Sequence, residues 1–491
     1  MTILLATLNA RYTHASLGLR YLLANMGELR DQTAIQEFVI GAKTTEMVER
    51  ILSHNPKIVG FGVYIWNVEE TTKLVATLKR VAPHIVILLG GPEVSHETAG
   101  QPIVQLADYV VTGWGDVTFP ALCRDILHGP KPLMKVHAGV QPPMADIALP
   151  YALYSDDDIA HRTLYVEASR GCPFKCEFCL SALDKTAWPF NIDTFLAEME
   201  ALHARGARVF KFVDRTFNLN IKTSLKIMQF FLDKLTAAPD DPVYAHFELV
   251  PDHLPDALKE GIARFPPGAL QFEIGIQSFN PTVQGNISRK QDNDKAAANI
   301  RWLCEHSNVH MHVDLIAGLP GETVDSFAEG FDKLWALGPH EIQFGILKRL
   351  RGTPIIRHTE AFGLVFDPYP PYTILANRDI DFPAMQRLVR FARYWDLVAN
   401  SGRFTHVTPV LLGEQPFASF MAFSDWLYAN TDATHRIALD RLAALVGKYL
   451  QQQGVADVAA LLASDGHGVK QKVAPVPGVA APQRQARHLV A

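Results

Sequence analysis

Cysteine is scarce in this chain, with only five residues among 491. So small a number excludes a disulfide framework, and a reducing compartment, the cytoplasm, is expected. Long apolar runs are missing too, since none approaches the ~20 residues of a membrane helix. The first residues carry no basic leader ahead of their apolar run, so we expect neither a secretory signal nor contact with a membrane.

An excess of charge of one sign is also missing. The 46 basic and 51 acidic residues leave a net charge of −5, which gives no global basic field for nucleic acid, and no nucleic-acid-binding segment is evident. What is present is ordinary globular material, 48% hydrophobic and 20% charged. The length of the chain suggests roughly three domains.

Residues 1–140 alternate short apolar runs with amphipathic segments. The runs at 3–8, 58–63, 85–89 and 108–112 predict buried parallel strands. Between them apolar residues recur at helical spacing, as at Leu74, Val75, Leu78 and Val81, and again at Phe119, Leu122, Cys123 and Ile126. This pattern predicts a doubly wound, Rossmann-like α/β domain, in which a ligand crevice lies at the carboxyl ends of the strands.

The rest of the chain is expected to form a linker, a barrel and a helical region. Residues 141–160 end a proline-rich stretch with the acidic run Asp156–Asp158, and they predict a linker. Residues 161–360 repeat strand and helix about six times, which falls short of the eight units of a closed barrel and predicts a partial (β/α)6 barrel. The expected strands are 164–168, 209–213, 243–249, 270–276, 309–316 and 342–347. Residues 361–463 are expected to be mainly helical, and 464–491, rich in Pro, Gly, Ala and Gln, to be a disordered tail.

Three of the five cysteines fall within one short segment, GCPFKCEFC, after the first expected strand of the barrel. They are Cys172, Cys176 and Cys179. Three thiolates on one loop can hold three irons of a cubane cluster and leave the fourth iron open. A zinc site is less expected, because such sites show paired C-x2-C units or a Cys/His quartet, and His161 is a weak fourth ligand. Cys123 and Cys304 lie on apolar helical faces and are expected to be core residues.

This segment resembles the cluster loop of radical S-adenosylmethionine (SAM) enzymes, in which an aromatic residue, here Phe178, precedes the third cysteine. The resemblance implies a [4Fe-4S] cluster whose open iron binds SAM and whose electron cleaves it to a 5′-deoxyadenosyl radical. It also implies an electron donor such as flavodoxin or ferredoxin. The other positions that resemble SAM-binding residues of the family are Asp214, Glu273, Gln277, Ile316 and Gly318.

Several of these positions also have a plain structural explanation. Asp214 follows the second barrel strand and could be a buried carboxylate at its rim. Strand alternation puts Glu273 and Gln277 on one face, which could be the barrel interior. Ile316 and Gly318 belong to the stretch VDLIAGLPGE, which resembles the part of the family that carries the adenine, but a simple strand-to-helix turn accounts for its glycines nearly as well.

The order of α/β domain, linker and barrel resembles the cobalamin-dependent branch of the radical SAM family. The residues that resemble its cobalamin-binding loops are Asn9, Tyr12, His14, Trp66, Gly90, Gly91, Glu93, Gly113 and Gly115. The D-x-H-x-x-G motif that supplies an axial histidine in other cobalamin proteins is absent. The resemblance therefore implies cobalamin bound without a histidine ligand, with His14 as a loop residue. A relic fold that has lost cobalamin is the alternative.

The resemblance extends over residues 1–460 and implies an enzyme that removes a hydrogen atom from an unactivated carbon. Methyl transfer from cobalamin to that carbon is the leading expectation. The alternatives are cobalamin-assisted rearrangement, cyclisation or oxidation, and a non-catalytic cobalamin- or redox-sensing module. The intact cysteine triad weighs against a sensor. No residue identifies the substrate, which is a small molecule or a macromolecule.

Overall fold

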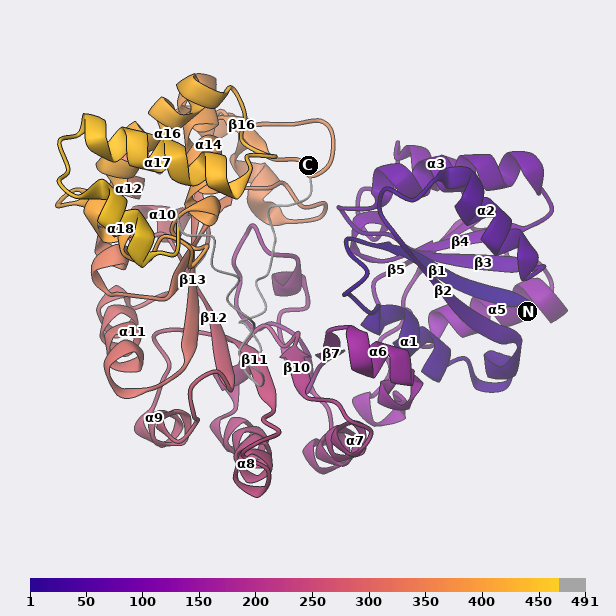
Figure 1. The fold of residues 1–491 in the computed structure, drawn as a ribbon. Coiled ribbons are helices and arrows are strands. Elements are labelled where there is room, and N and C mark those ends of the chain that lie inside the picture. Colours follow the sequence, from indigo (N-terminus) through magenta and orange to yellow (C-terminus); the bar gives the residue numbers. More distant parts are fainter. Residues whose placement is uncertain (468–491) are drawn as a thin grey trace.

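The N-terminal domain is a six-stranded parallel sheet covered by helices on both faces. The computed structural model describes residues 1–467 (Figure 1). The strands lie in the order β2-β1-β3-β4-β5-β6. They are β1 Ile3–Asn9, β2 Thr33–Val39, β3 Ile58–Gly62, β4 Val86–Gly90, β5 Tyr109–Thr112 and β6 Val136–Ala138. The doubly wound α/β fold expected from the sequence is confirmed.

Alternation along the strands builds the two layers of helices. On β1, Leu4 and Leu8 pack towards helices α2 (Thr44–Ser53) and α3 (Val68–Val81), whereas Ile3 and Leu5 pack towards α1 (Leu17–Ala24) and α5 (Thr118–His128). The helices are α1 Leu17–Ala24, α2 Thr44–Ser53, α3 Val68–Val81, α4 Pro102–Leu106 and α5 Thr118–His128, with the 3-10 turns η1 Gly27–Gln32 and η2 Pro92–Val94. Val81 departs from the expected apolar face, since it ends α3 and is 58% exposed.

Strands β2 and β6 were not expected from the sequence. Both lie at the edges of the sheet, where one side of a strand has no neighbour and less apolar sequence is needed. β2 reads TAIQEFV and buries fully only its first residue and Phe38, so it lacks a continuous apolar run. β6 has three residues and buries none of them completely.

The second domain is the partial barrel. Its six parallel strands lie in the order β14-β13-β12-β11-β10-β7, so neighbours in the chain are neighbours in the sheet. They are β7 Leu164–Val166, β10 Val209–Phe212, β11 Tyr244–Leu249, β12 Leu270–Gln277, β13 His310–Ala317 and β14 Glu341–Ile346. The outer helices are α7 Ile192–Ala204, α8 Ile221–Ala237, α9 Asp256–Ala263, α10 Pro281–Asn286, α11 Asn293–His306 and α12 Val324–Ala336. The expected (β/α)6 arrangement is confirmed, and β7 is the edge strand nearest the N-terminal domain (Figure 1).

The segment predicted to be a linker is instead a packed joint between the domains. It contains η3 Met144–Asp146, η4 Tyr151–Leu153 and α6 Asp156–His161. Tyr151 and Tyr154 are completely buried, and their hydroxyls donate to backbone carbonyls of the first barrel strand and the residue after it. Asp158 of the acidic run is buried too and accepts from Arg20 at 2.7 Å and Arg162 at 2.9 Å. Composition alone misread this segment, because its main partner, Arg20, lies far away in the sequence.

The C-terminal region is mainly helical, as expected, and packs on one flank of the barrel (Figure 1). It starts with η7 Pro354–His358, α13 Thr359–Phe362 and a short hairpin of β15 Val365–Phe366 and β16 Ile374–Ala376. α14 Phe382–Leu397, α15 Val407–Leu412, α16 Pro416–Thr431, α17 Leu439–Gln452 and α18 Val458–Ser464 follow. The aromatic residues Phe331, Phe391 and Trp395 join α14 to α12 of the barrel.

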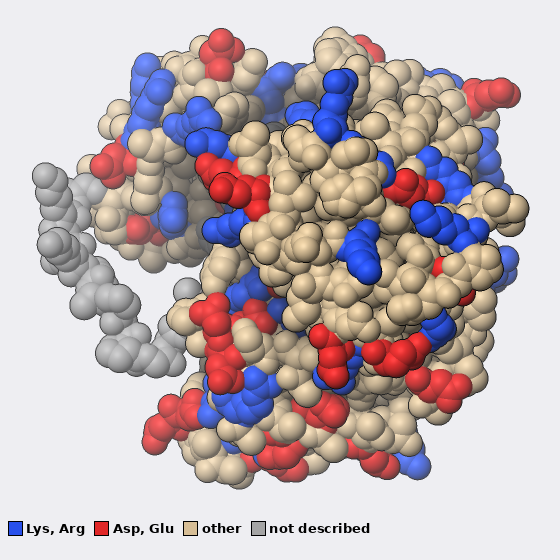
Figure 2. All heavy atoms as spheres, turned by 90° about the vertical axis from the view of Figure 1, so that its right-hand side faces the viewer, with Lys and Arg blue, Asp and Glu red and all other residues tan. Residues whose placement is uncertain are grey.

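The expected tail starts later than predicted. The ring of His467 stacks on Phe404 with centroids 4.5 Å apart, so residues 464–467 are packed. The rest of the expected tail, from residue 468, lies outside the described residues. Within residues 1–467 no helix combines the length and the apolar character that a membrane span requires. Lys and Arg are interspersed with Asp and Glu over the face in Figure 2, in keeping with the small net charge.

Candidate active site

The three clustered cysteines line one cavity of about 390 Å³ at the carboxyl end of the barrel strands. Their loop runs from the short strand β8 Ser169–Gly171, which pairs with β9 Ala187–Pro189, to the turn η5 Leu180–Leu183. Cys172 and Cys176 are buried and Cys179 is half-buried, and none of them forms a disulfide. Burial raises the pKa of the Cys172 and Cys176 thiols. In the described residues these are three free thiols on one loop facing one cavity, which is the donor set that a cubane cluster with one open iron requires.

The remaining cysteines lie elsewhere, as expected. Cys123 is completely buried in α5, in the core of the N-terminal domain. Cys304 on α11 is half-buried, and its thiol donates to the carbonyl of Leu337 at 3.4 Å. Neither lines the cavity of the other three.

The cysteine loop is fixed at its start and in its middle. At its start, Gly171 has φ +85°, and a Cβ there would meet the carbonyl oxygen of Thr186 at 2.3 Å, so only glycine fits. In its middle, Glu177 is buried, and its carboxylate contacts the imidazole of His358 at 2.8 Å and the guanidinium of Arg357. These contacts hold the thiols before any ligand binds.

Asp214 does not line the cavity, although the sequence placed it among the residues facing the cofactor. Its carboxylate accepts from the backbone N–H of Ala168 at 2.9 Å and from the hydroxyl of Ser169 at 2.6 Å. Burial raises its pKa to about 7. Asp214 therefore positions the corner that leads into the cysteine loop.

The end of β12 carries a cavity residue, Gln277, with an unusual backbone conformation and an unpaired side-chain oxygen. Glu273 and Gln277 both line it, with Gly275 between them, as strand alternation predicts. Gln277 has φ +69°, an uncommon conformation for a residue other than glycine, and it sits at an irregularity in the pairing with β13. Its side-chain oxygen is buried and has no hydrogen-bond partner among the described residues. A strained residue that holds an unpaired acceptor in a cavity is a mark of a ligand-binding position.

Phe178 lines the same cavity, whereas Ile316 and Gly318 do not. Gly318 has φ +89° and abuts the side chains of Ile374 and Met385, so it serves packing against the C-terminal region. Asp314, two residues before Ile316 on β13, lines the cavity in its place. Arg289 was also missed by sequence reasoning, and its guanidinium lies 3.6 Å from the Sγ of Cys176.

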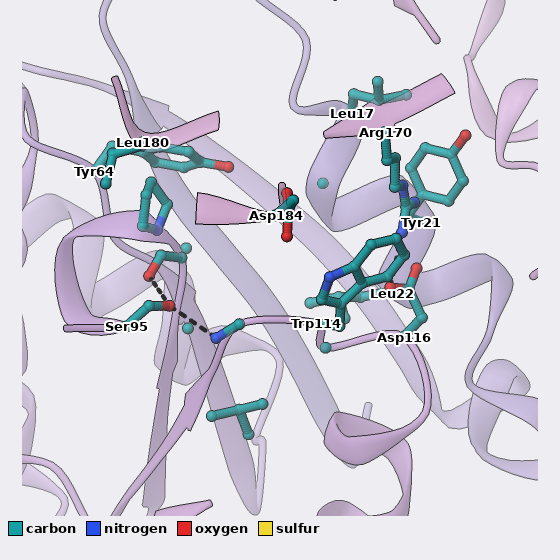
Figure 3. Close-up of a pocket in the computed structure, with 18 of the residues that line it drawn as sticks. Leu17, Tyr21, Leu22, Tyr64, Ser95, Trp114, Asp116, Arg170, Leu180 and Asp184 are labelled. Atoms are coloured by element: carbon teal, nitrogen blue, oxygen red, sulfur yellow. Dashed lines mark hydrogen bonds and ion pairs between the residues drawn. The ribbon is translucent and has the colours of Figure 1, made fainter. Parts of the chain in front are cut away.

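A second cavity, of about 520 Å³, opens at the carboxyl ends of the N-terminal strands (Figure 3). The glycines predicted to bind cobalamin gather there: Gly90, Gly91, Gly113 and Gly115. A Cβ on Gly113 would meet nothing within 4 Å, and one on Gly90 nothing closer than 3.7 Å, so these two positions leave open space. Ser95 joins the two glycine loops. Its hydroxyl donates to the carbonyl of Gly91 at 2.8 Å and accepts from the N–H of Gly113 at 3.0 Å. A broad crevice floored by glycine backbone fits a corrin, which is a large disc fringed with amides.

The opposite wall of this crevice belongs to the barrel domain. Arg170 lies over the ring of Tyr21, 4.2 Å from its centroid, and faces Trp114 as well (Figure 3). Its guanidinium binds Asp116 of the N-terminal domain at 2.9 Å and Glu167 at 2.6 Å. This buried ion pair joins the two domains at the crevice.

The two cavities adjoin one another. Gly171 lines the crevice, and the next residue, Cys172, lines the cysteine cavity. Arg215 lines both. Ligands in the two cavities would therefore approach each other across the cysteine loop.

Five of the nine residues predicted to bind cobalamin do not line the crevice. They are Asn9, Tyr12, His14, Trp66 and Glu93. Asn9 donates to Glu37 at 2.9 Å, and Tyr12 donates to Asp157 at 2.8 Å. The Nδ1 of His14 lies 2.6 Å from the hydroxyl of Tyr165. His14 therefore ties the loop after β1 to β7 of the barrel, Tyr12 ties it to α6 of the joint, and Asn9 bonds β2 within the N-terminal domain.

Trp66 and Glu93 also have other partners. Trp66 is 41% exposed and stacks on Tyr64, which itself lines the crevice. Glu93 is buried and accepts from the hydroxyl of Tyr372 at 2.6 Å and from Arg351 at 2.8 Å. Glu93 therefore joins the N-terminal domain to the segment that follows β14.

Sequence reasoning missed several crevice residues. Trp114 and Asp116 lie within the glycine motif of the loop after β5, so their neighbours pointed to them. Asp184 and Arg170 flank the cysteine loop, and no sequence motif indicated that either would line the crevice. His96 is a histidine in the crevice that no motif indicates, and its ring abuts Gly352.

A buried carboxyl beside the site gives a prediction about pH. Burial raises the pKa of Glu322 to about 8, although the hydroxyl of Ser278 donates to it at 2.5 Å. The ordinary value is 4.5, so between these two pH values the folded protein holds a proton that the unfolded chain releases. The free energy of unfolding therefore falls as pH rises from about 4.5 to about 8. We expect the thermal midpoint of Glu322→Gln, relative to that of the wild type, to rise as pH increases over this range, because the variant lacks this loss.

The exposed Glu329 on α12 provides the control. Glu329→Gln should keep the wild-type profile of thermal midpoint against pH. A Glu322→Gln profile as steep as that of the wild type would show that Glu322 does not carry the effect.

Comparison with known proteins now identifies the two domains. The family model of the B12 binding domain matches residues 3–123, and that of the Radical SAM superfamily matches residues 166–334. Residues 360–462 match a family described as a protein of unknown function, DUF4080. The matched segments cover most of the N-terminal sheet, most of the barrel and the C-terminal helices.

Two curated relatives are named as methyltransferases. An uncharacterized methyltransferase of Pyrococcus horikoshii is 25% identical over 340 residues, covering 63% of this chain and 71% of that protein. The cobalamin-dependent radical SAM methyltransferase TokK of Streptomyces tokunonensis is 24% identical over 331 residues, covering 61% of this chain but only 47% of TokK. This chain thus spans about half the length of TokK.

Solved structures share the fold at low sequence identity. The cobalamin-dependent radical enzyme OxsB superposes with a TM-score of 0.65 at 12% identity, over 94% of this chain and 81% of OxsB. The radical SAM methyltransferase TsrM of Kitasatospora setae gives 0.59 at 17% identity, over 75% of this chain and 76% of TsrM. Both superpositions extend over three quarters or more of this chain. The chain therefore carries a B12 binding domain at residues 3–123 ahead of a domain of the radical SAM superfamily at residues 166–334.

Proposed function

We propose that this protein is a cobalamin-dependent radical SAM methyltransferase that methylates an unactivated carbon. The observation that carries the proposal is the contact of the two cavities through Gly171, Cys172 and Arg215. A hydrogen-abstracting group and a methyl donor are useful together only when both reach the same carbon. The names of the relatives, which include methyltransferases of this class, support methylation over rearrangement or oxidation.

The chain's own residues would divide the work between the two cavities. Cys172, Cys176 and Cys179 would hold a [4Fe-4S] cluster, and the glycines of the crevice would seat cobalamin. When bound, the cluster with SAM supplies a 5′-deoxyadenosyl radical and cobalamin supplies a methyl group. Arg170 and its partners Asp116 and Glu167 wall the crevice from the side of the barrel, which would limit the access of water to a bound substrate.

Within the cysteine cavity, Glu273 and Gln277 are the groups that would bind SAM. Glu273 can accept hydrogen bonds from a ribose or an ammonium group, and the unpaired oxygen of Gln277 can accept one more. Phe178 would pack beside them. Asp214 would keep the cysteine loop in place without contact to the cofactor.

An electron donor is also required, and the rim of the cavity suggests its charge. Lys175 and Lys290 are exposed there, beside Arg289. A small acidic donor such as flavodoxin or ferredoxin would fit this basic rim. The free thiols suit a reducing compartment such as the cytoplasm.

The direct test of function supplies reductant, SAM and methylcobalamin to the reconstituted enzyme. We expect slow release of 5′-deoxyadenosine without substrate. With substrate, S-adenosylhomocysteine should form as well, and labelled methyl from SAM should appear in the product. If 5′-deoxyadenosine forms with the true substrate but neither S-adenosylhomocysteine nor a labelled product is found, the enzyme rearranges or oxidises its substrate instead.

A second prediction concerns SAM binding. Gln277→Ala and Glu273→Gln should weaken SAM affinity by about tenfold or more, because each removes an acceptor in the cavity, a loss of at least ~1.4 kcal/mol. Iron content should stay at the wild-type level, since neither residue is a thiolate. Equilibrium dialysis with SAM and iron analysis check both parts.

Gln229→Ala is the matched control, because Gln229 is exposed on α8 outside the cavity. It should leave SAM affinity unchanged. Wild-type affinity in both cavity variants would remove Glu273 and Gln277 from the binding site.

A further inference from the structure

The interior of the barrel is polar at its amino end. Side chains two apart on a strand share a face, so His310 and His312 of β13 lie on the face that carries Asp314 into the cysteine cavity. Glu341, at the start of the neighbouring strand β14, pairs in register with His312. Barrels of this kind are usually filled by branched apolar side chains. Two imidazoles and a carboxylate in that place need an explanation that the radical chemistry does not supply.

The three side chains converge on a small volume. The Nε2 atoms of His310 and His312 each lie 3.2 Å from the Oε1 of Glu341. One ligand atom from each of the three residues falls within 4.8 Å of the other two. The side chain of His312 is 6% exposed and that of Glu341 15%. Zinc bonds of about 2.0–2.2 Å with tetrahedral angles put ligand atoms about 3.4 Å apart, close to the two separations seen here.

The Nε2 of His312 faces two polar groups. The amide nitrogen of Gln271 lies 2.8 Å from it and the carboxylate oxygen of Glu341 lies 3.2 Å from it. One imidazole nitrogen cannot accept from the amide and donate to the carboxylate at once. A metal ion bound between Nε2 and Oε1 would take the lone pair of Nε2, so the amide nitrogen of Gln271 must then turn away from His312.

A third histidine lies beside the cluster. The ring centroid of His340 is 4.7 Å from that of His310.

We propose that His310, His312 and Glu341 bind a divalent transition-metal ion, of which zinc is the best fit, at the amino end of the barrel. Two imidazoles with one carboxylate are a donor set that zinc uses. The site lies towards the end of the strands opposite the cysteine loop. Its role would be to fix β13 against β14 beneath the SAM-binding groups.

The test uses the full chain with its cluster reconstituted, and zinc as the probe. Metal analysis should find one zinc per chain in addition to the iron. X-ray absorption at the zinc edge should show only nitrogen and oxygen ligands at about 2.0–2.1 Å and no sulfur at about 2.3 Å, which separates this site from the cysteines. Glu341→Gln should weaken zinc binding by about tenfold or more, measured by competition with a chromophoric chelator.

His406→Ala is the matched control, because the exposed imidazole of His406 is engaged elsewhere, 2.8 Å from the buried carboxylate of Asp465. It should leave zinc affinity unchanged. Iron content at the wild-type level certifies that a variant is folded. If a variant loses iron, its zinc titration is repeated in a chain in which all three cluster cysteines are changed to serine. In that chain, with His310, His312 and Glu341 intact, zinc must still bind. Sulfur ligands, the absence of stoichiometric zinc, or undiminished affinity in Glu341→Gln would each overturn the site.

Discussion

Replacing any one of Cys172, Cys176 and Cys179 by alanine should abolish the iron–sulfur cluster and all release of 5′-deoxyadenosine. Anaerobically reconstituted wild-type protein should contain about four irons per chain and absorb broadly in the visible range. Each variant should lose both, because two thiolates on one loop cannot hold a cubane. No substitute thiol is near in the described residues, since Cys123 lies in another core and burial raises its pKa to about 12.

Cys123→Ala and Cys304→Ala are the controls and should keep the cluster. Iron analysis, the visible spectrum and deoxyadenosine release are measured on all five variants. If Cys304→Ala loses the cluster, a fourth protein ligand exists and the fourth iron is not open to SAM. Retention of four irons in any variant of the triad would equally contradict the site.

Filling the glycine crevice should abolish corrinoid binding. Gly90→Phe puts an aromatic ring into the space that Gly90 leaves open, where a Cβ itself meets nothing closer than 3.7 Å. We expect affinity for hydroxocobalamin to fall by at least about 100-fold in the full chain, because a rigid corrin cannot share that space. Iron content should be unchanged, since Gly90 belongs to the other domain.

Gly90→Ala is the graded control and should bind cobalamin within a few-fold of the wild type, because one methyl group fits. His14→Ala should leave the spectrum of bound cobalamin unchanged, since His14 lies outside the crevice against Tyr165. Tight binding by Gly90→Phe would place the corrin elsewhere. A nitrogen hyperfine pattern that His14→Ala removes would show that His14 is an axial ligand.

The strand and helix pattern was largely predictable because it depends on local periodicity. Buried parallel strands form short apolar runs, so the six barrel strands were found near their observed bounds. Edge strands break this rule. β2 and β6 have an unpaired side and therefore carry too little apolar sequence to be recognised.

The candidate site was predictable only where its residues are close in the sequence. The cysteine triad is set by spacing within one loop, and Glu273 and Gln277 by alternation along one strand. The sequence placed Asp214 in the cavity because this residue follows a strand. In the structure its carboxylate instead accepts a hydrogen bond from the backbone N–H of Ala168. Such a contact depends on tertiary packing, which spacing does not encode.

The domain interface shows the same limit. Glu93 follows two glycines in a crevice loop, so the sequence favoured a role in cobalamin binding. Its observed partners, Arg351 and Tyr372, lie more than two hundred residues away. Arg170 and Asp116 form the corresponding contact across the crevice, and neither had a motif that linked it to the other.

Electron paramagnetic resonance of the full chain tests whether the cluster and cobalamin lie side by side across the cysteine loop. The chain is loaded with cob(II)alamin and a reduced cluster, and no substrate is needed. We expect cob(II)alamin to broaden the cluster signal and speed its relaxation, and we expect Gly90→Phe, which excludes the corrin, to restore the isolated signal. A cluster signal identical with and without bound cob(II)alamin in the wild type would show that the two cofactors lie apart.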